Sequence, residues 1–166
     1  MKIIIVGAGK IGITLAELFA SEGHDITIID KNQKIVNAAV DKYDVMGVHG
    51  NGTNVIVLKE AHADKADILI SVASTDEINM LTCTIAQKIG VKYTLARIRN
   101  PENIEQINFI YNELGINMVV NPEYETAEEI YRTIRFPSAL KLEKFARGAV
   151  EIAEVVISEY HPLVGI

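Results

Sequence analysis

The stretch Ile3-Ile4-Ile5-Val6-Gly7-Ala8-Gly9-Lys10-Ile11-Gly12 decides the fold of this chain. Its four consecutive β-branched residues are typical of a strand buried on both faces, as in a parallel sheet. The three glycines follow at the point where such a strand turns into a helix, in a G-x-G-x-x-G spacing. In that spacing Gly7 permits the tight turn, Gly9 lets the backbone approach a ligand, and Gly12 lets the helix pack closely.

The helix that begins at this turn would point its unpaired N–H groups and the positive end of its dipole beyond Gly9. That arrangement favours an anion such as the pyrophosphate of a dinucleotide. A second apolar strand, residues 26–29, delivers Asp30 at its end, 18 residues after Gly12. An acidic residue at about this spacing, roughly 20 residues, meets the adenosine ribose in dinucleotide-binding folds. The alternative is a glycine turn that only lets strand and helix pack, with Asp30 as a solvated helix-capping residue.

Length and composition exclude several classes of protein. A chain of 166 residues corresponds to one domain with room for part of a second. Its net charge of −6 argues against a nucleic-acid partner, because no basic stripe is present to neutralise phosphates. The single cysteine, Cys83, allows no internal disulfide and favours a reducing cytoplasm. No stretch approaches the ~18 apolar residues of a membrane span, and the chain begins directly in its first strand, so we expect neither membrane insertion nor a targeting segment.

Strands and helices alternate along the rest of the chain. The expected strands are residues 3–6, 26–29, 45–48, 66–72, 93–97 and 117–120, and helices are expected after each of them. A capping box at Ser74 and Glu77 predicts one helix start, and Asn100-Pro101 and Asn121-Pro122 predict two more. This pattern predicts an α/β fold, a Rossmann-like doubly wound parallel sheet of six strands in the order 3-2-1-4-5-6. The ligand would lie at the switch point, between the turns that follow the first and fourth strands.

The pattern changes after Phe136-Pro137. Residues 138–147 predict a short helix, with Leu140, Leu142 and Phe145 among its apolar positions. After a break at Gly148, residues 150–157 predict one more strand.

Four groups of residues together resemble a known family. They are Gly7-Ala8-Gly9-Lys10-Ile11-Gly12, His24-Asp25-Ile26-Thr27-Ile28-Ile29-Asp30, Ala66-Asp67 with Thr75-Asp76-Glu77-x-Asn79, and Ala96-Arg97. Residues 1–135 are similar to the N-terminal domain of TrkA-type potassium-uptake regulators, the nucleotide-binding module also called the KTN or RCK domain. By this resemblance residues 136–147 would be a crossover helix and linker, and residues 148–166 the truncated start of a C-terminal ligand domain.

The resemblance implies a regulatory rather than an enzymatic role. Domains of this family pair as homo-oligomers, dimers or larger rings, through their last helix and crossover. They lie in the cytoplasm against a membrane potassium-translocating subunit, TrkH-like or KtrB-like, and convert nucleotide binding into gating. The expected ligand is NAD or NADH, with ATP or ADP as the alternative.

The resemblance also implies which residues would hold that ligand. In the glycine turn, Gly7, Gly9, Lys10 and Gly12 would hold phosphates, with Ala8 and Ile11 in the same turn. Asp30, with Lys31 beside it, would hold the ribose, and Asn51, Gly52 and Thr53 would border the adenine. Ala73, Ser74, Thr75 and Arg97 would flank the pyrophosphate or second nucleoside. Relatives usually carry Asp at the position of Asn51 and a bulkier residue than Gly52, and Glu123 matches an acidic residue that in some relatives lies near a neighbouring subunit's ligand or a cation.

Several candidate residues also have a structural interpretation. Lys10 is either a phosphate ligand or an ordinary exposed lysine. Arg97 ends a buried strand, where a guanidinium needs either an anionic ligand or a carboxylate. Asp76 and Glu77 resemble a catalytic carboxylate pair, but their place in the first turn of a helix is a sufficient reason for them. The four histidines share no metal-ligand spacing, so we expect no metal site.

Two other functions remain possible from the sequence. The same glycine turn serves NAD-dependent oxidoreductases, but only 31 residues follow Arg135 to supply a substrate platform, and no tyrosine has a lysine four positions later. The third alternative is an α/β scaffold that binds no nucleotide and acts through its dimer surface.

Overall fold

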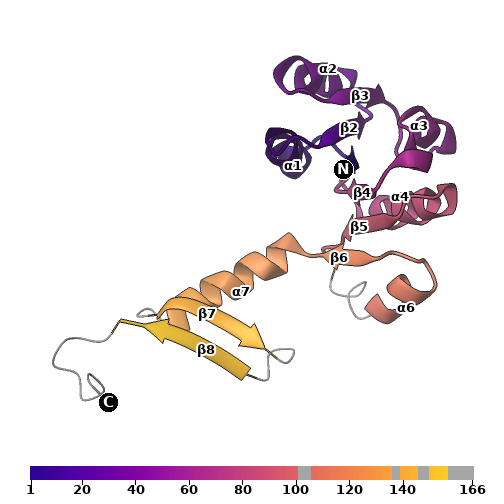
Figure 1. Ribbon diagram of the computed structural model, residues 1–166. Helices are drawn as coiled ribbons and strands as arrows, with labels where there is room; N and C mark the ends of the chain where they lie inside the picture. The colour runs from indigo at the N-terminus through magenta and orange to yellow at the C-terminus, as the bar shows by residue number, and fades with distance from the viewer. Residues whose placement is uncertain (101–105, 136–138, 146–149, 157–166) are drawn as a thin grey trace. The chain divides into compact units, whose positions relative to one another are not determined.

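The computed structural model describes residues 1–100, 106–135, 139–145 and 150–156 (Figure 1). Contacts within the chain divide it into two units, Met1–Pro122 and Glu123–Ile166.

The first unit is built on one parallel sheet. Its strands are β1 (Lys2–Val6), β2 (Asp25–Asp30), β3 (Met46–His49), β4 (Ile68–Ser71), β5 (Tyr93–Arg97) and β6 (Met118–Val120). They lie in the order β3-β2-β1-β4-β5-β6, and every neighbouring pair is parallel. The predicted doubly wound Rossmann-like fold and its strand order are therefore confirmed.

Helices cover both faces of this sheet. Those of the first unit are α1 (Lys10–Ser21), α2 (Gln33–Lys42), α3 (Val55–Glu60), the short 3₁₀ helix η1 (Ala63–Lys65), α4 (Asp76–Ile89) and α6 (Ile107–Asn112). Figure 1 shows α1 and α2 on one face, and α3, α4 and α6 on the other. This two-sided cover is why the central strands have apolar side chains pointing both ways.

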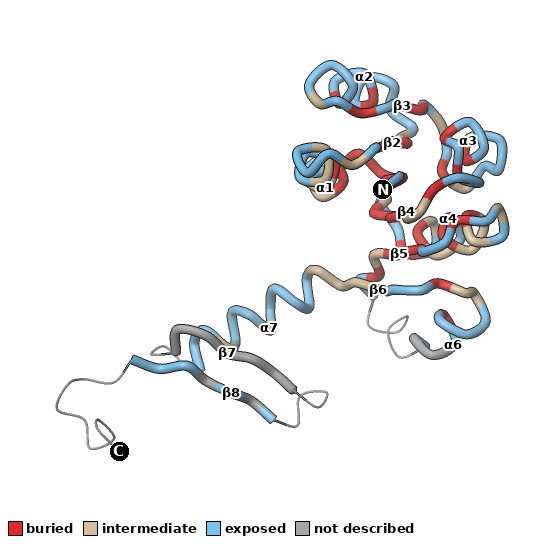
Figure 2. Tube along the Cα trace, in the orientation of Figure 1, coloured by how far each residue is buried: buried red, intermediate tan, exposed pale blue. Residues whose placement is uncertain are grey.

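β1 is the centre of both hydrophobic cores. Ile3 and Ile5 pack in one buried cluster with Ala16 of α1. Ile4 and Val6 point to the opposite face and belong to a second cluster, with Leu58 of α3. Figure 2 shows the buried residues concentrated along the strands and the inner sides of the helices. The unbroken β-branched run is thus explained by burial on two faces.

Cys83 belongs to the second core. It is fully buried in α4, and its thiol donates a hydrogen bond to the carbonyl of Leu95 at 3.3 Å. Burial raises the pKa of the Cys83 thiol to about 12. The thiol therefore stays protonated and acts as a small core side chain.

One predicted helix start differs from the structure, and another lies partly outside the described residues. The capping box at Ser74 and Glu77 is wrong, because α4 begins one residue later and its N-cap is Thr75, whose Oγ1 accepts from the N–H of Ile78 at 3.4 Å. Ser74 still belongs to the preceding loop, where its carbonyl accepts a hydrogen bond from Arg99. The start expected at Asn100-Pro101 falls at Pro101 outside the described residues.

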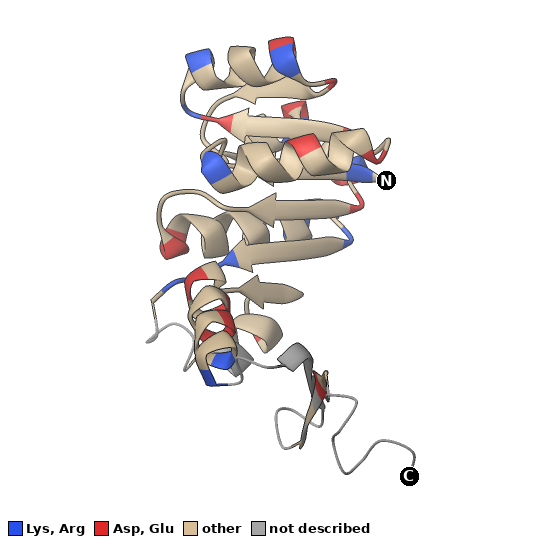
Figure 3. Cartoon of the chain, turned by 90° about the vertical axis from the view of Figure 1, so that its left-hand side faces the viewer, with Lys and Arg blue, Asp and Glu red and all other residues tan. Residues whose placement is uncertain are grey.

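The second unit contains nearly all of α7 (Pro122–Arg135) and an antiparallel pair, β7 (Ala139–Phe145) and β8 (Val150–Val155). The proline start of α7 is confirmed, and Figure 3 shows acidic residues in its first turns and basic residues in its last, the arrangement that favours the helix dipole. The helix predicted over residues 138–147 is wrong where it can be compared, because residues 139–145 form β7. Leu140 and Leu142 alternate with Lys141 and Glu143, a strand period, and pairing with β8 selects it.

The division after Pro122 places nearly all of α7 in the second unit, and the domain boundary expected at residue 135 stays a prediction. In the part of the chain that the structure describes, no helix is long and apolar enough to span a bilayer.

Candidate nucleotide-binding crevice

A crevice of about 410 Å³ opens at the carboxyl ends of the central strands. Its walls come from the ends of β1, β2 and β5 and from the turns after β1, β2, β3 and β4. This is the switch point of the sheet, because the chain continues from β1 to β2 on one side and reaches β4 on the other. The volume is within the range of about 300–1,000 Å³ usual for small-molecule sites.

The glycine turn forms the middle of the crevice. Gly7 has a φ of +99°, and a Cβ there would lie 2.8 Å from the backbone nitrogen of Ala73. A Cβ on Gly12 would lie 1.9 Å from the carbonyl oxygen of Gly7, whereas one on Gly9 would meet nothing within 4 Å. Gly7 and Gly12 are therefore required by packing, and Gly9 faces open space.

The amino end of α1 is prepared for an anion. Its N-cap, Gly9, provides no side-chain hydrogen bond, and the first turn holds no acidic residue. The first hydrogen bond of the helix runs from the N–H of Ile13 to the carbonyl of Gly9. The N–H groups of Lys10 and Ile11 come before it, so they have no acceptor within the helix. Gly9 lines the crevice, so the amino end of α1, with the positive end of its dipole, lies at the crevice wall.

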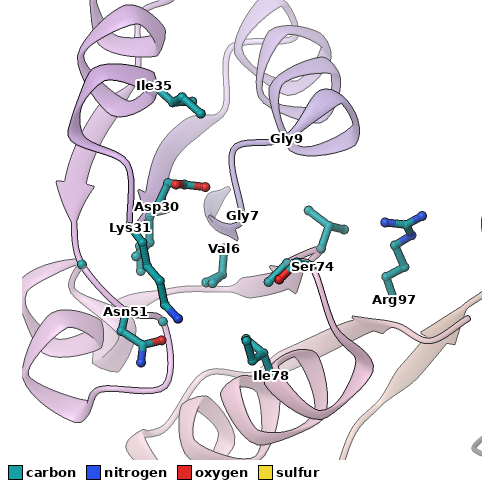
Figure 4. Close-up of a pocket in the computed structure, with 15 residues that line it drawn as sticks. Val6, Gly7, Gly9, Asp30, Lys31, Ile35, Asn51, Ser74, Ile78 and Arg97 are labelled. Carbon is teal, nitrogen blue, oxygen red and sulfur yellow. The ribbon is translucent and has the colours of Figure 1, made fainter.

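Asp30 lies at one end of the crevice and holds its turn together (Figure 4). Its Oδ2 accepts from the N–H of Ala8 at 2.7 Å, and its Oδ1 accepts from the N–H of Asn32 at 2.8 Å. The N-cap of α2 is Asn32, which accepts from Lys34 at 3.0 Å, so the helix-capping interpretation of Asp30 is wrong. A carboxylate has about four lone-pair sites, so two hydrogen bonds leave capacity for ribose hydroxyls.

Arg97 lies at the opposite end, with the glycine turn between it and Asp30 (Figure 4). Lys31 also lines the crevice, and its side chain extends along the wall that carries Asn51. Asp30, Lys31 and Arg97 are the charged residues among the lining residues, a net positive set in a chain whose net charge is −6. The crevice is thus electrostatically suited to an anionic ligand.

The wall after β3 is packed against the core. A Cβ on Gly52 would lie 2.3 Å from Cγ1 of Val6, so a larger residue requires Val6 to move. Asn51 lines the crevice, and its Oδ1 accepts from the N–H of Thr53 at 3.2 Å. Because that oxygen faces a donor, the amide nitrogen of Asn51 is the group available to a ligand.

The structure brings together most of the residues predicted for this site. Those that line the crevice are Gly7, Gly9, Asp30, Lys31, Asn51, Gly52, Ala73, Ser74 and Arg97. Those that do not line it are Ala8, Lys10, Ile11, Gly12, Thr53 and Thr75. Ala8 and Thr75 instead serve the local hydrogen bonds described above, and Gly12 serves helix packing.

Six lining residues were not predicted: Val6, Ile29, Ile35, Gly50, Val72 and Ile78. Val6, Ile29 and Val72 lie at strand ends beside the predicted turns, so strand register was the signal that could have found them. Ile35 of α2 and Ile78 of α4 come from facing helices, and only the packing of those helices brings them to the crevice (Figure 4). They add apolar surface suited to a planar ring.

The fold and the crevice define a Rossmann-like α/β domain with its site at the switch point. The sequence profile of the TrkA-N domain family matches residues 3–122. The chain belongs to the TrkA-N domain family.

Related sequences agree with this assignment. The Trk system potassium uptake protein TrkA of Vibrio alginolyticus is 38% identical over 168 residues, which cover 99% of this chain and 37% of that relative. A TrkA homologue of Methanothermobacter thermautotrophicus is 31% identical over 157 residues, covering 95% of this chain and 71% of that relative. The chain therefore spans little more than a third of the bacterial relative's length and most of the archaeal one's.

Solved structures agree on the fold. The TrkA-N domain of the inner membrane protein ybaL from Escherichia coli superposes with a TM-score of 0.71 at 22% identity, covering 80% of this chain and 96% of that one. The GsuK channel bound to NAD gives a TM-score of 0.68 at 21% identity, covering 87% of this chain and 25% of that one.

Proposed function

We propose that this chain is the nucleotide-binding regulatory part of a potassium transport system. It binds NAD(H), or ATP and ADP, in the crevice. Binding controls the gating of a membrane potassium-translocating subunit, TrkH-like or KtrB-like, from the cytoplasmic side. The observation that carries the proposal is the glycine turn, which opens on a crevice with a carboxylate at one end and a guanidinium at the other.

Each part of a dinucleotide has a matching group in the crevice. The first-turn N–H groups of α1 match phosphate oxygens, and Asp30 matches ribose hydroxyls. Ile35 and Ile78 match the apolar faces of a base, and Arg97 matches a second phosphate or nucleoside. Related folds were solved with such ligands: GsuK with NAD and with ADP, and a Kef C-terminal domain from Shewanella denitrificans with AMP.

The charges of the crevice support regulation rather than catalysis. Among the described lining residues, the only carboxylate is that of Asp30, and it already accepts two backbone hydrogen bonds. The cations, Lys31 and Arg97, suit phosphate binding. Regulation requires that the ligand favour one arrangement of the assembled chains over another, because equal affinity for both shifts nothing.

The first experiment is a titration of the chain with NAD, NADH, ATP and ADP, followed by calorimetry and thermal unfolding. A ligand that binds only the folded state stabilises it by about 2.7 kcal/mol at a hundredfold excess over Kd. For a chain of this size we expect the Tm to rise by about 5–10 °C. NADP(H) serves as the control and should bind more weakly, because the carboxylate of Asp30 repels a 2′-phosphate. No rise with any of the four ligands would contradict the proposal, and turnover of NADH with candidate substrates would favour an oxidoreductase.

The exposed face of α7 supports a homo-oligomer. Tyr124, Ile130, Tyr131 and Ile134 are 59%, 56%, 57% and 74% exposed in the single chain, at the spacing of one helix face. Figure 2 shows α7 without buried residues. A second copy of α7 is a partner that would cover such a face.

Charges placed on that face should separate the copies. We expect the double substitution Ile130→Asp and Ile134→Asp to convert the assembled chain to monomers in light scattering, because two carboxylates would be buried without partners. The Tm of the six-stranded unit should change little. Glu125→Lys, on the exposed first turns of the same helix, is the control and should leave the assembly intact. An unchanged molar mass of the double variant would exclude α7 from the interface.

A further inference from the structure

The buried side chain amide of Asn79, in α4, lies behind the wall of the crevice. Sequence patterns indicated no role for it. The wall, called here the β4–β5 wall, consists of Ala73, Ser74 and Arg97, which follow or end two neighbouring strands. Asn79 of α4 is only 1% exposed and does not itself line the crevice. A buried amide needs partners, and those of Asn79 lie in both halves of this wall.

The two ends of the Asn79 amide bind the two strands. Its Oδ1 accepts from the N–H of Ala73 at 2.7 Å and from the hydroxyl of Ser71 at 2.9 Å. Its Nδ2 donates to the carbonyl of Arg97 at 2.8 Å. These donors and acceptors fix the orientation of the amide, because reversing it would set oxygen against a carbonyl and nitrogen against N–H.

Asp76 extends the same connection beyond β5. It is 6% exposed, and its Oδ2 accepts from the N–H groups of Arg99 at 3.0 Å and Asn100 at 2.8 Å. Arg99 in turn donates to the carbonyl of Ser74. One turn of α4 thus holds the loop after β4 and the segment after β5 in a single arrangement.

We propose that Asn79, with Asp76, is a positioning residue that makes the β4–β5 wall one rigid unit, so that a nucleotide touching Ser74 and Arg97 meets both at fixed positions. The inference rests on the proposed function, because the ligand is the nucleotide of the same crevice. It adds that ligand contact with either half of the wall is transmitted to residues 98–100, which lead out of the site.

Thr82 provides a matched control on the same helix. It is fully buried, and its hydroxyl has no hydrogen-bond partner among the described residues. Thr82→Val keeps the shape of the side chain and removes a polar atom that makes no such bond. It therefore tests for the general effect of altering the buried side of α4.

The experiment compares the 166-residue chain with Asn79→Ala, Asn79→Asp and Thr82→Val. Kd for ADP and NADH is measured at 10 °C, where circular dichroism confirms that each variant is folded, so loss of global stability does not enter. We expect Kd to rise about tenfold for Asn79→Ala. Asn79→Asp keeps an oxygen for Ala73 and, when ionised, loses the donor to Arg97, so its Kd should rise at pH 8 and recover as the new carboxyl is protonated at lower pH. Thr82→Val should bind as the unchanged chain does.

Amide hydrogen exchange tests the wall without any ligand. In Asn79→Ala we expect the amide protons of Ala73 and Asn100 to exchange about tenfold faster. The second of these donates to Asp76 rather than to Asn79, so its acceleration shows that the two residues act together. If the unchanged chain binds neither ligand, the proposed function fails. Hydrogen exchange still shows whether Asn79 and Asp76 hold the β4–β5 wall as one unit. Unchanged exchange at Asn100, or an unchanged Kd in a chain that binds nucleotide, overturns the inference.

Discussion

Gly12→Ala is expected to cost about 4 kcal/mol or more of the free energy of unfolding, the range in which a single substitution abolishes stable folding. A Cβ at this position would lie 1.9 Å from the carbonyl oxygen of Gly7. That oxygen cannot retreat easily, because the N–H of Gly7 donates to the carbonyl of Ile29 at 2.9 Å and the backbone of Ala73 lies 2.8 Å from the position of a Cβ on Gly7. The added methyl must therefore push α1 away from β1, where both cores meet.

Urea unfolding followed by circular dichroism measures this loss, and Gly9→Ala is its control. Gly9 has a φ of −71° and open space around its Cβ position, so the same change should alter stability by less than about 1 kcal/mol. The Gly9 variant should instead bind nucleotide more weakly, because the methyl occupies the space that a phosphate would take. Equal urea midpoints for Gly12→Ala and the unchanged chain would show that α1 adjusts without strain.

Asp30→Ala is expected to weaken NADH binding by roughly ten- to a hundredfold, the loss of hydrogen bonds to a charged group worth about 1.5–3 kcal/mol. The carboxylate would bind the ribose while holding the N–H groups of Ala8 and Asn32. Its removal also leaves those two N–H groups without their acceptor, so the glycine turn should become more mobile. Calorimetry measures the affinity, and the exchange rate of the Ala8 amide proton measures the turn.

Two further variants separate these effects. Asp30→Asn keeps one acceptor oxygen and removes the charge, so it should lose less affinity for NADH and should lower the discrimination against NADP(H). Asp41→Ala removes an exposed carboxylate of α2 and should change neither quantity. Unchanged NADH affinity in Asp30→Ala would remove Asp30 from the ligand site, leaving it a structural connection between β2 and the turn.

Local patterns predicted the first unit well because its strongest signals agree with its tertiary contacts. The β-branched run of β1 is buried on both faces, as its composition indicates. Patterns failed where contact with another segment of the chain decides the outcome. Residues 139–145 contain apolar positions compatible with a helix, yet their pairing with β8 makes them a strand. The N-cap of α4 is Thr75 rather than the predicted Ser74, whose carbonyl accepts a hydrogen bond from Arg99, 25 residues away.

The sequence alone determined the glycine turn, the acidic residue at the end of β2, and the alternation of strands and helices that defines a doubly wound sheet. These follow from short-range rules, since backbone conformation, burial period and strand-end position are all expressed within a few residues. Only the tertiary structure decided which predicted residues line the crevice, how Asp30 is engaged, and that Asn79 joins two strands behind it. Those features depend on which side chains meet across the sheet, and a hydrogen bond between residues far apart in the chain leaves no periodic trace in the sequence.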